Sequence, residues 1–362
     1  MDIKIFTENI EWQALEQIYT LAKQPAFETC KIRIMPDVHA GEGCVIGFTA
    51  NLGEKVIPGV VGVDIGCGMR TIELGKIDID FEKLDKVIRK YVPSGRAIRE
   101  DNIYSFKDIS LLRCFSKLKD VNLIERNLGT LGGGNHFIEI DSDSEGNKYL
   151  VIHTGSRSLG KQVAEYYQNL AIDNIRRNSE NRTGKGIPKD LCYLEGSDRD
   201  DYLHDMQICQ KFAIENRTTI AESIIDNMGL KIVNEFETVH NYIELKTNIV
   251  RKGAISAKKG ERVLIPINMR DGCIIGIGKG NEDWNESAPH GAGRLMSRSK
   301  AKESISLEDF AKAMEGIYTT SVSQSTIDES PMAYKSMEEI LEKVGDTIEV
   351  EKIIKPVYNF KA

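Results

Sequence analysis

Residues 149–170 read YLVIHTGSRSLGKQVAEYYQNL, and the apolar pattern changes within this stretch. Its beginning is rich in β-branched and aromatic residues, which is typical of a buried strand over 148–154. Its end carries Leu159, Val163, Tyr166 and Leu170, which recur at helical spacing. A strand that passes through a short polar loop directly into an amphipathic helix predicts a mixed fold of sheets and helices.

The same two patterns recur on both sides of this stretch. Helical spacing predicts helices at 11–25, 81–92, 158–178, 199–228, 306–317 and 336–344. Runs rich in Ile, Val and Tyr predict strands at 30–38, 44–50, 70–78, 136–141, 148–154, 242–251, 261–268, 271–277 and 347–358. The elements do not alternate with a fixed period, so neither an eight-fold barrel nor a doubly wound sheet is favoured. We expect an α+β fold in which residues 1–362 form a single large mixed domain.

Two polar features within that domain need an interpretation. The stretch Asn178–Asp190 is short and lies between predicted helices, so we interpret it as an exposed loop rather than a domain boundary. In the helix at 199–228 the apolar stripe passes through Asn216 and Arg217. Since buried polar groups need partners, we expect Asn216 to bond a neighbouring loop and Arg217 to lie at a rim. A direct role of either residue at a functional site is the alternative.

Composition limits the class of protein and its partners. The 362 residues are 41% hydrophobic and 28% charged, which is ordinary globular usage and excludes a disordered or collagen-like chain. The net charge of −7 is the opposite of that of a general nucleic-acid coat protein, so a polyanion would need a local basic patch. The stretches Arg251–Arg262 and Arg294–Lys302 are candidates, and solvated faces are the alternative.

The cysteines and the apolar runs indicate a compartment. Seven cysteines include no C-x-x-C pair, which argues against a disulfide framework and for a reducing environment. The first residues carry no apolar core of the length that a secretory signal needs. No window approaches the roughly 18 apolar residues of a membrane span. We expect a cytoplasmic protein without a membrane partner.

The histidines share an unusual setting. Five of the six lie in short contexts rich in Gly, Asn or Ser, namely PDVHAGEG, GGGNHF, VIHTGSRS, TVHNY and APHGAGR. Glycine lets backbone approach a ligand closely, and loops at strand ends are where catalytic groups gather. The coincidence predicts a functional site built from these loops.

A sixth glycine-rich segment offers metal ligands. Residues 58–70 read PGVVGVDIGCGMR and place Asp64 and Cys67 three residues apart in a turn. Together with His136, His153 and His240 they suffice for one or two divalent ions, because a thiolate can bridge two metals. By ligand softness zinc or iron suits this set about as well as manganese. Taken singly, each residue is as well explained by packing or an ordinary hydrogen bond.

Phosphate binding is indicated at one loop and not at two others. HTGSRSLG places Arg157 and free backbone donors at the start of a helix, where phosphate is stabilised, although an ordinary N-cap explains the same residues. The segments GEGCVIG (41–47) and GIGKGN (276–281) lack the spacing of nucleotide-binding motifs. For residues 276–280 we expect a tight hairpin.

Taken together, these motifs resemble those of the RtcB family, GTP-dependent RNA-splicing ligases that join RNA 3′-phosphate or 2′,3′-cyclic phosphate ends to 5′-hydroxyl ends. The segments that carry the resemblance span nearly the whole chain in the family's order: MPDVHAGEGCVIG, GVDIGCGM, LGGGNHFIEI, VIHTGSRSLG, DMQICQKFAIENR, VHN, HGAGR and AYK. The resemblance implies an RtcB-like fold with a central metal and nucleotide cleft, two Mn²⁺ ions, GTP and an RNA substrate.

The resemblance also assigns roles to individual residues. Asp64, Cys67 and His136 match the ligands of one manganese, and Cys67, His153 and His240 match those of the second. His290 matches the nucleophile that attacks the α-phosphate of GTP and holds GMP as a phosphoramidate. We assign Arg157 to an RNA phosphate. The implied nucleotide contacts are Asn135, His136, Phe137, Ile138, Glu139, His240, Asn241, Pro266, Met269, His290, Gly291, Ala292, Gly293 and Lys335.

The chain departs from the family pattern at two segments. Residues 266–273 read PINMRDGC where the family more often shows Pro-Gly-Ser-Met followed by small and hydroxyl residues, and Cys273 stands near an expected Ser. Ser158 stands where Gly is usual. An alternative is therefore a divergent metal-dependent nucleotidyl transferase, phosphatase or cyclic phosphodiesterase that does not ligate, and a non-catalytic RNA-binding relative is a third. The natural RNA, in tRNA splicing or RNA repair, and the need for an activating protein are left open.

Overall fold

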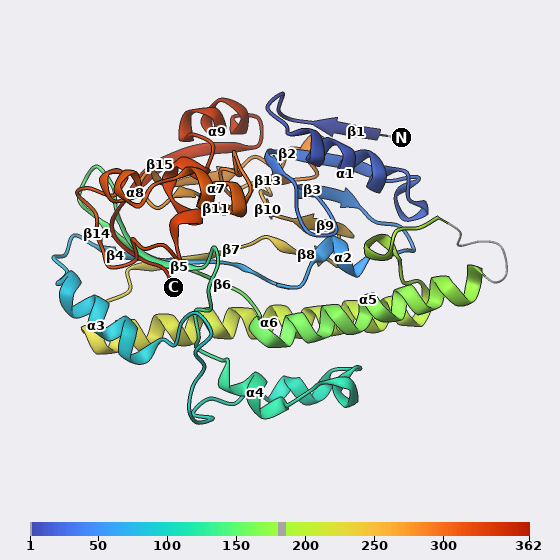
Figure 1. Cartoon of the computed structure of the whole chain (residues 1–362), viewed down its shortest axis with the longest axis horizontal. Helices are drawn as coiled ribbons and strands as arrows, with labels where there is room; N and C mark the ends of the chain where they lie inside the picture. Colours follow the sequence, from blue (N-terminus) through green and yellow to red (C-terminus); the bar gives the residue numbers. More distant parts are fainter. Residues whose placement is uncertain (1, 180–185) are drawn as a thin grey trace.

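Sheets form the upper part of the molecule, and two long helices run beneath them (Figure 1). The computed structural model describes residues 2–179 and 186–362. The larger sheet has the strand order β11-β12-β15-β5-β6-β4-β7, and β14 pairs with β15. Its strands are β4 (Gly68–Gly75), β5 (Phe137–Ser142), β6 (Lys148–Thr154), β7 (Asn234–Val239), β11 (Arg262–Asn268), β12 (Gly272–Gly278), β14 (Tyr318–Thr319) and β15 (Ile348–Phe360).

A smaller sheet carries the N-terminal part of the chain. Its order is β1-β2-β3-β9-β8, and a separate pair joins β10 to β13. The strands are β1 (Asp2–Ile5), β2 (Lys31–His39), β3 (Ile46–Asn51), β8 (Asn241–Glu244), β9 (Ile249–Lys252), β10 (Ala254–Ser256) and β13 (Ser287–Pro289). Pairing of β2 with β3 is irregular between Ile34 and His39. Pro36 lies in this interval and has no N–H to donate, which suits an interruption of the ladder.

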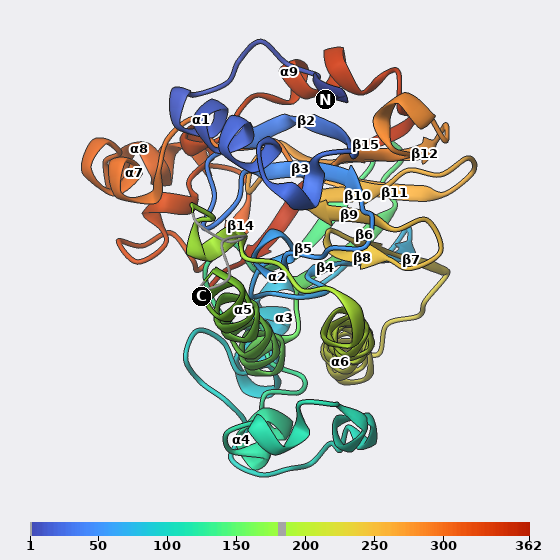
Figure 2. The same ribbon diagram turned by 90° about the vertical axis from the view of Figure 1, so that its right-hand side faces the viewer.

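Helices cover the sheets from below and at the edges. The long helices α5 (Arg157–Ser179) and α6 (Gly196–Met228) pack side by side, and Figure 2 shows them nearly end-on beneath the strands. The predicted α+β class, with sheets flanked by helices, is confirmed. The remaining α-helices are α1 (Trp12–Ala22), α2 (Pro58–Val61), α3 (Phe81–Tyr91), α4 (Val121–Arg126), α7 (Arg298–Ser304), α8 (Leu307–Ala313) and α9 (Met337–Val344).

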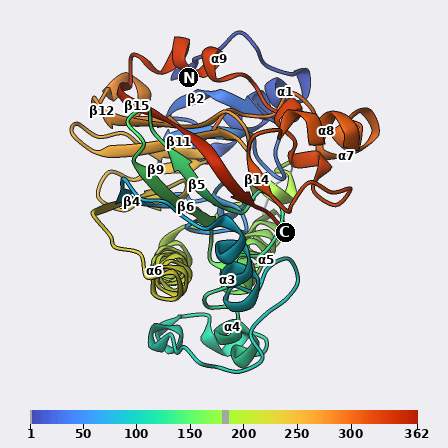
Figure 3. The same cartoon turned by 90° about the vertical axis from the view of Figure 1, so that its left-hand side faces the viewer.

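Successive side chains of β5 alternate between the apolar core on one face of the sheet and the candidate site on the other. Ile138 and Ile140 pack in a buried cluster with Leu84 of α3 and Ile224 of α6. Figure 3 shows β15 crossing beside β5, with α3 below the sheet. Successive residues of a strand point to opposite faces, so Glu139 faces away from this apolar cluster. Full burial of each such isoleucine contributes about 1.5–3 kcal/mol, which fixes the register of the strand.

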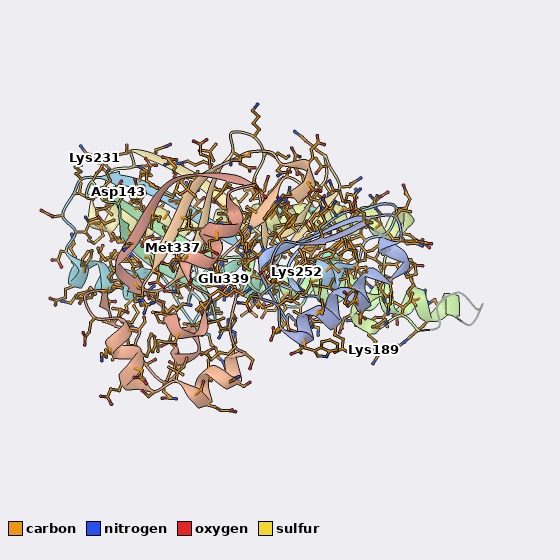
Figure 4. All side chains as sticks on the ribbon, turned by 90° about the horizontal axis from the view of Figure 1, so that it is seen from above. Asp143, Lys189, Lys231, Lys252, Met337 and Glu339 are labelled. Carbon is orange, nitrogen blue, oxygen red and sulfur yellow. The ribbon has the colours of Figure 1, made fainter. Side chains whose placement is uncertain are left out.

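The N-terminal segment is tied to the end of the chain. In the view from above, Glu339 of α9 lies beside the N-terminal strands (Figure 4). Asn9 Nδ2 lies 3.0 and 3.2 Å from the two carboxylate oxygens of Glu339. Lys335 donates from Nζ to the carbonyl oxygens of Asn9 at 2.9 Å and Pro36 at 3.0 Å. These contacts hold the segment before β2 against the C-terminal part of the fold.

Several sequence predictions differ from the structure. The single strand predicted at 242–251 is wrong, because a turn with Asn248 at φ 54° separates the hairpin strands β8 and β9. The hairpin predicted at residues 276–280 is also wrong. Gly276 and Gly278 lie in β12, and the hairpin turn is at 269–271. A Cβ on Gly278 would lie 2.3 Å from the Lys258 carbonyl oxygen, so glycine is needed there for close approach of two backbones.

Part of one prediction lies outside the described residues. Of the polar stretch interpreted as an exposed loop, residues 180–185 belong to that part, while Lys189–Leu191 forms a short 3₁₀ turn. Within residues 2–179 and 186–362, no helix combines the length and apolarity that crossing a membrane requires.

Candidate active site

The five predicted metal ligands come from neighbouring strands of the larger sheet. Cys67 precedes β4, which pairs with β6 on one side and with β7 on the other. His153 lies in β6 opposite Phe137 of β5, and His136 directly precedes that strand. His240 directly follows β7. Pairing in this register brings residues that are far apart in sequence to one edge of the sheet.

At that edge the donor atoms form two overlapping groups. Cys67 Sγ lies 3.5 Å from His136 Nε2 and 3.3 Å from His153 Nε2. Asp64 Oδ2 lies 3.0 Å from His136 Nε2, and His153 Nε2 lies 3.4 Å from His240 Nε2. In each group, Asp64–Cys67–His136 and Cys67–His153–His240, the donor atoms lie within 4.8 Å of one another. Cys67 is the member that the two groups share.

The hydrogen bonds of the histidines fit bound cations. His136 Nδ1 lies 2.9 Å from the Leu131 carbonyl oxygen, and His153 Nδ1 lies 3.1 Å from that of Asn135. A carbonyl oxygen only accepts, so both Nδ1 atoms carry the hydrogen and both Nε2 atoms present lone pairs. These Nε2 lone pairs lie next to the Cys67 sulfur, and His240 Nε2 lies beside that of His153, so a cation placed among them would meet nitrogen and sulfur donors. The donor set therefore fits two cations that share Cys67.

Burial shifts the pKa values of the Cys67 thiol and of the imidazoles of His153 and His240. A bound cation would reverse the shift of the thiol, whereas the shift of the imidazoles favours the neutral form that binds a cation. Burial, and then the charge of Asp64, raise the pKa of the Cys67 thiol well above its usual value. Burial is also the main cause that lowers the pKa of His153 and of His240, which keeps both imidazoles neutral. A cation favours the thiolate and needs neutral imidazole, so binding one would release a proton from Cys67.

The turn and the strand that carry the ligands are fixed from below by α6. Arg217 is fully buried and donates from Nη1 to the carbonyl oxygens of Gly66 at 3.0 Å and Thr154 at 2.8 Å, beside Cys67 and His153. Its expected place at a rim is therefore wrong. The expectation for Asn216 is confirmed, since its Oδ1 accepts from the backbone N–H of Gly129 at 2.7 Å.

Asp64 is held close to the backbone of the loop after β6. Ser156 N–H donates to Asp64 Oδ1 at 3.0 Å. A Cβ added to Gly155 would lie 2.0 Å from Asp64 Oδ1 and 2.5 Å from its carboxyl carbon. Only glycine lets the loop approach this carboxylate.

We therefore expect Gly155→Ala to displace Asp64 and weaken metal binding in one group about 10–100-fold, as loss of supporting contacts does at metal sites. Manganese bound per chain after equilibrium dialysis measures the effect. Gly53→Ala is the matched control, because a Cβ there meets nothing within 4 Å. Equal metal contents in the two variants would contradict the interpretation.

His290 lies beside the second group and is held by a buried carboxylate. Asp37 Oδ2 lies 2.6 Å from His290 Nδ1 and also accepts the backbone N–H of His290 at 3.1 Å and of Gly291 at 3.2 Å. Asp37 is fully buried and lies in the irregular part of β2 next to Pro36. The ring centroids of His290 and His240 are 4.9 Å apart. Sequence reasoning missed Asp37, although a carboxylate between apolar residues of a predicted strand is a usable signal.

A cavity that is partly open to solvent extends from His290. Predicted nucleotide contacts that line it are Asn135, Phe137, Glu139, Pro266, Met269, His290, Gly291, Ala292 and Gly293. Residues that were not predicted as nucleotide contacts also line it, namely His39, Met69, His153, Ile267, Asn268, Arg294, Arg298, Glu329, Tyr334 and Lys361.

Charged groups from the C-terminal part of the chain meet at this cavity. Lys361 donates to Glu329 at 2.5 Å, Tyr334 Oη donates to it at 2.6 Å, and Arg298 also pairs with it. Burial opposes ionisation of Glu329, but the charges of Lys361 and Arg298 outweigh it and hold its pKa well below the usual value. The network presents cationic groups and a phenol beside the carboxylate of Glu139.

Five predicted nucleotide contacts do not line this cavity. Three of them, His136, His240 and Asn241, line the two further openings described below. The side chain of Ile138 points to the opposite face of β5, as the period of a strand requires, and is buried in the apolar cluster. The Nζ of Lys335 donates to the backbone carbonyl oxygens of Asn9 and Pro36.

Two further openings reach the metal ligands. Arg157 lines one opening with Asp64, His136, Arg96 and Lys161, and its Nη1 lies 3.3 Å from His136 Nδ1. The other is lined by Asp64, Cys67, His240, Asn241, His290 and residues such as Arg294. The predicted ligands thus lie between openings that carry basic side chains.

Comparison with known proteins gives a consistent result. The family model described as "tRNA-splicing ligase RtcB" matches residues 17–121 and 114–362. The chain is 32% identical to the protein named RNA-splicing ligase RtcB of Escherichia coli strain K12, over 96% of this chain and 94% of that protein. It is 29% identical to the protein named tRNA-splicing ligase RtcB of Aeropyrum pernix over 85% and 82%, and 28% identical to the one of that name of Methanococcus maripaludis over 95% and 90%.

Proposed function

The chain belongs to the RtcB family, and from this premise we propose that it is an RNA ligase that joins RNA 3′-phosphate or 2′,3′-cyclic phosphate ends to 5′-hydroxyl ends. We propose that it uses GTP and two Mn²⁺ ions and forms a histidine-GMP intermediate. The observation that carries the proposal is the pair of Asp37 and His290, 2.6 Å apart, beside two groups of side chains suited to metals.

Asp64, Cys67 and His136 would hold one manganese, and Cys67, His153 and His240 the other. When bound, the two cations orient the triphosphate and neutralise the charge that develops on it. The mixed oxygen, nitrogen and sulfur donors support two shared-ligand cations, while the choice of manganese over zinc or iron comes from the family. Direct metal analysis of the purified protein distinguishes these metals.

His290 would act as the nucleophile. Its Nδ1 hydrogen is donated to Asp37, which leaves the lone pair on Nε2 for attack. The Nε2–phosphorus bond to the α-phosphate of GTP forms, the bond to the bridging oxygen breaks, and pyrophosphate leaves. The imidazole gains positive charge in this step, and the buried carboxylate of Asp37 stabilises that charge.

The cavity beside His290 would take the guanine nucleotide. Glu139 offers carboxylate oxygens that accept hydrogen bonds, and Lys361 offers an ammonium group that donates. A guanine ring presents N–H donors and a carbonyl acceptor on one edge, which complements such a pair. The glycines on either side of Ala292 leave room for phosphate beside His290.

The RNA would approach from the opening lined by Arg96, Arg157 and Lys161. Arg157 begins the long helix α5, so backbone donors as well as the guanidinium are available to a terminal phosphate. A cyclic end is first opened to a 3′-phosphate. GMP then passes from His290 to that phosphate, and the 5′-hydroxyl attacks the same phosphorus and displaces GMP as the ester bond forms.

We further propose that residues 1–362 work as one catalytic domain in the cytoplasm. The reducing environment that the cysteine pattern predicts supports this place, since all seven cysteines are free and buried. Relatives are named for tRNA splicing, so tRNA halves are one candidate substrate and damaged RNA is another.

The test is incubation with α-labelled GTP and manganese, followed by RNA of defined ends. We expect an acid-labile covalent adduct that is absent from His290→Ala, and joined RNA after addition of 3′-phosphate and 5′-hydroxyl ends. No adduct with metal-loaded protein would overturn the proposed intermediate. An adduct or phosphate release without joined RNA would instead favour the non-ligating alternative suggested by the altered segment Pro266–Cys273.

A further inference from the structure

A third group of potential metal ligands lies at the floor of the nucleotide cavity. Glu139 and Asp141 of β5 and Cys273 of β12 place their ligand atoms within 4.8 Å of one another. They are 3%, 0% and 0% exposed, so the group is closed to bulk solvent except where Glu139 borders the cavity. None of the three belongs to the two groups around Cys67.

The topology of the sheet brings the three side chains together. β12 and β5 lie on either side of β15, and residues two apart on a strand share a face, so Glu139 and Asp141 point the same way. Cys273 belongs to an apolar cluster with Ile275, Leu264 and Tyr149. Tyr149 is the residue paired with Asp141 in the ladder. Asp141 therefore lies at the edge of an apolar layer.

Asp141 has no cationic partner for its charge among the described residues. Both of its carboxylate oxygens are buried, and the neighbour that favours its charged form is the thiol of Cys273. For Glu139, Asn359 Nδ2 donates to Oε1 at 2.5 Å, while Lys361, whose charge lowers the pKa of Glu139, forms an ion pair with Glu329. Buried charges in proteins are paired or coordinate metals, so two adjacent carboxylates beside one thiol and one amide leave a site that favours a cation.

The donor atoms indicate the class of cation. Two carboxylate oxygens and a thiol sulfur suit a borderline ion such as zinc, whereas magnesium and calcium prefer oxygen alone. Three protein ligands leave one position of a tetrahedral ion free. This position is next to the cavity, because Glu139 lines the cavity.

We propose that Glu139, Asp141 and Cys273 bind a single divalent cation of the zinc class, separate from the manganese pair. The site itself does not rest on the proposed function. One consequence does rest on it, because a cation behind Glu139 would keep that carboxylate charged and in place to accept hydrogen bonds from guanine.

A shared proton is the competing explanation. Burial raises the pKa of Asp141 to about 7, and burial and the neighbouring Asp141 raise the pKa of Glu139 well above its usual value. Without a cation, one proton held between the two carboxyl groups would relieve the same charge. The two explanations differ in metal content and in the state of the Cys273 sulfur.

The experiment counts zinc in protein from which the manganese pair has been removed. In Cys67→Ala we expect one zinc per chain after equilibrium dialysis, and none in Cys67→Ala/Asp141→Asn. Cobalt in place of zinc should give a thiolate-to-metal charge-transfer absorption in Cys67→Ala that disappears in Cys67→Ala/Cys273→Ser. Cys67→Ala/Cys209→Ser is the matched control and should keep the absorption, since Cys209 is an equally buried cysteine of α6.

The outcomes separate this site from the proposed function. Cys67→Ala that binds no zinc, or zinc binding unaffected by Asp141→Asn, would overturn the third site even if the wild-type protein forms the GMP adduct. Binding of one zinc by Cys67→Ala would support it even if no adduct forms. Thermal melting verifies that each variant folds. If Cys67→Ala does not fold, the comparison is a loss of one metal per chain between wild type and Asp141→Asn.

Discussion

Replacing Cys67 by alanine is expected to lower the manganese bound per chain from about two to near zero, because the shared thiolate serves both groups of ligands. Its sulfur lies 3.5 Å from His136 Nε2 and 3.3 Å from His153 Nε2, and Cys67 is the residue common to both groups. GMP adduct formation should fall with the metal. Elemental analysis after dialysis against excess manganese measures the first effect, and labelled GTP measures the second.

Two variants make this result specific. Asp64→Asn should lose about one manganese, since Asp64 belongs to one group only. Cys209→Ala should keep both, because Cys209 lies in the core contributed by α6. Two manganese ions per chain in Cys67→Ala would refute the shared ligand.

The second large effect is expected for Asp37→Asn, which should slow formation of the GMP adduct by about 10³–10⁴-fold, on the scale seen when the carboxylate partner of a catalytic histidine becomes an amide. Asp37 contacts His290 and is not among the residues that line the cavity, so we treat it as a positioning residue. The amide no longer enforces hydrogen on Nδ1 and no longer stabilises the charged imidazole. The loss should appear in kcat, with little change in KM for GTP.

Asp143→Asn is a suitable control for this change. Asp143 is another carboxylate with low exposure, held by Asn147 and Tyr149 at the turn between β5 and β6, and its pKa is lowered to about 2. Its replacement should leave adduct formation unaltered. If Asp37→Asn reacts as fast as Asp143→Asn, Asp37 does not position the nucleophile. Equal losses of kcat and of folded protein would indicate a purely structural role.

The sequence predicted the long elements and missed the short ones for a physical reason. Periodicity needs several turns or several alternations to register, which α6 and β15 provide and α2 and β13 do not. The interval 242–251 looked like one strand because Tyr242, Ile243 and Val250 are good strand formers. Pairing of β8 with β9 required the turn at 245–248 that the apolar pattern did not reveal.

The residues of the candidate site also fall into those that the sequence revealed and those that it did not. The predicted metal ligands were visible because they stand in short segments rich in Gly, Asn or Ser, and at Gly155 the backbone does approach Asp64 closely. Glu329 and Lys361 were not visible, because neither stands in a distinctive local setting. They reach the cavity only through the packing of the C-terminal part of the chain against β5.

The sequence by itself determined which chemical groups are candidates for binding metals, phosphate and nucleotide, since side-chain identity and local glycine spacing are properties of the chain. Only the tertiary structure decided the state and use of those groups. It placed Arg217 in the core rather than at a rim, put hydrogen on Nδ1 of His136 and His153 through carbonyl contacts, and set Asp141 beside Cys273. Charge, tautomer and coordination depend on distance and solvent exclusion, and these exist only once strands distant in sequence have paired.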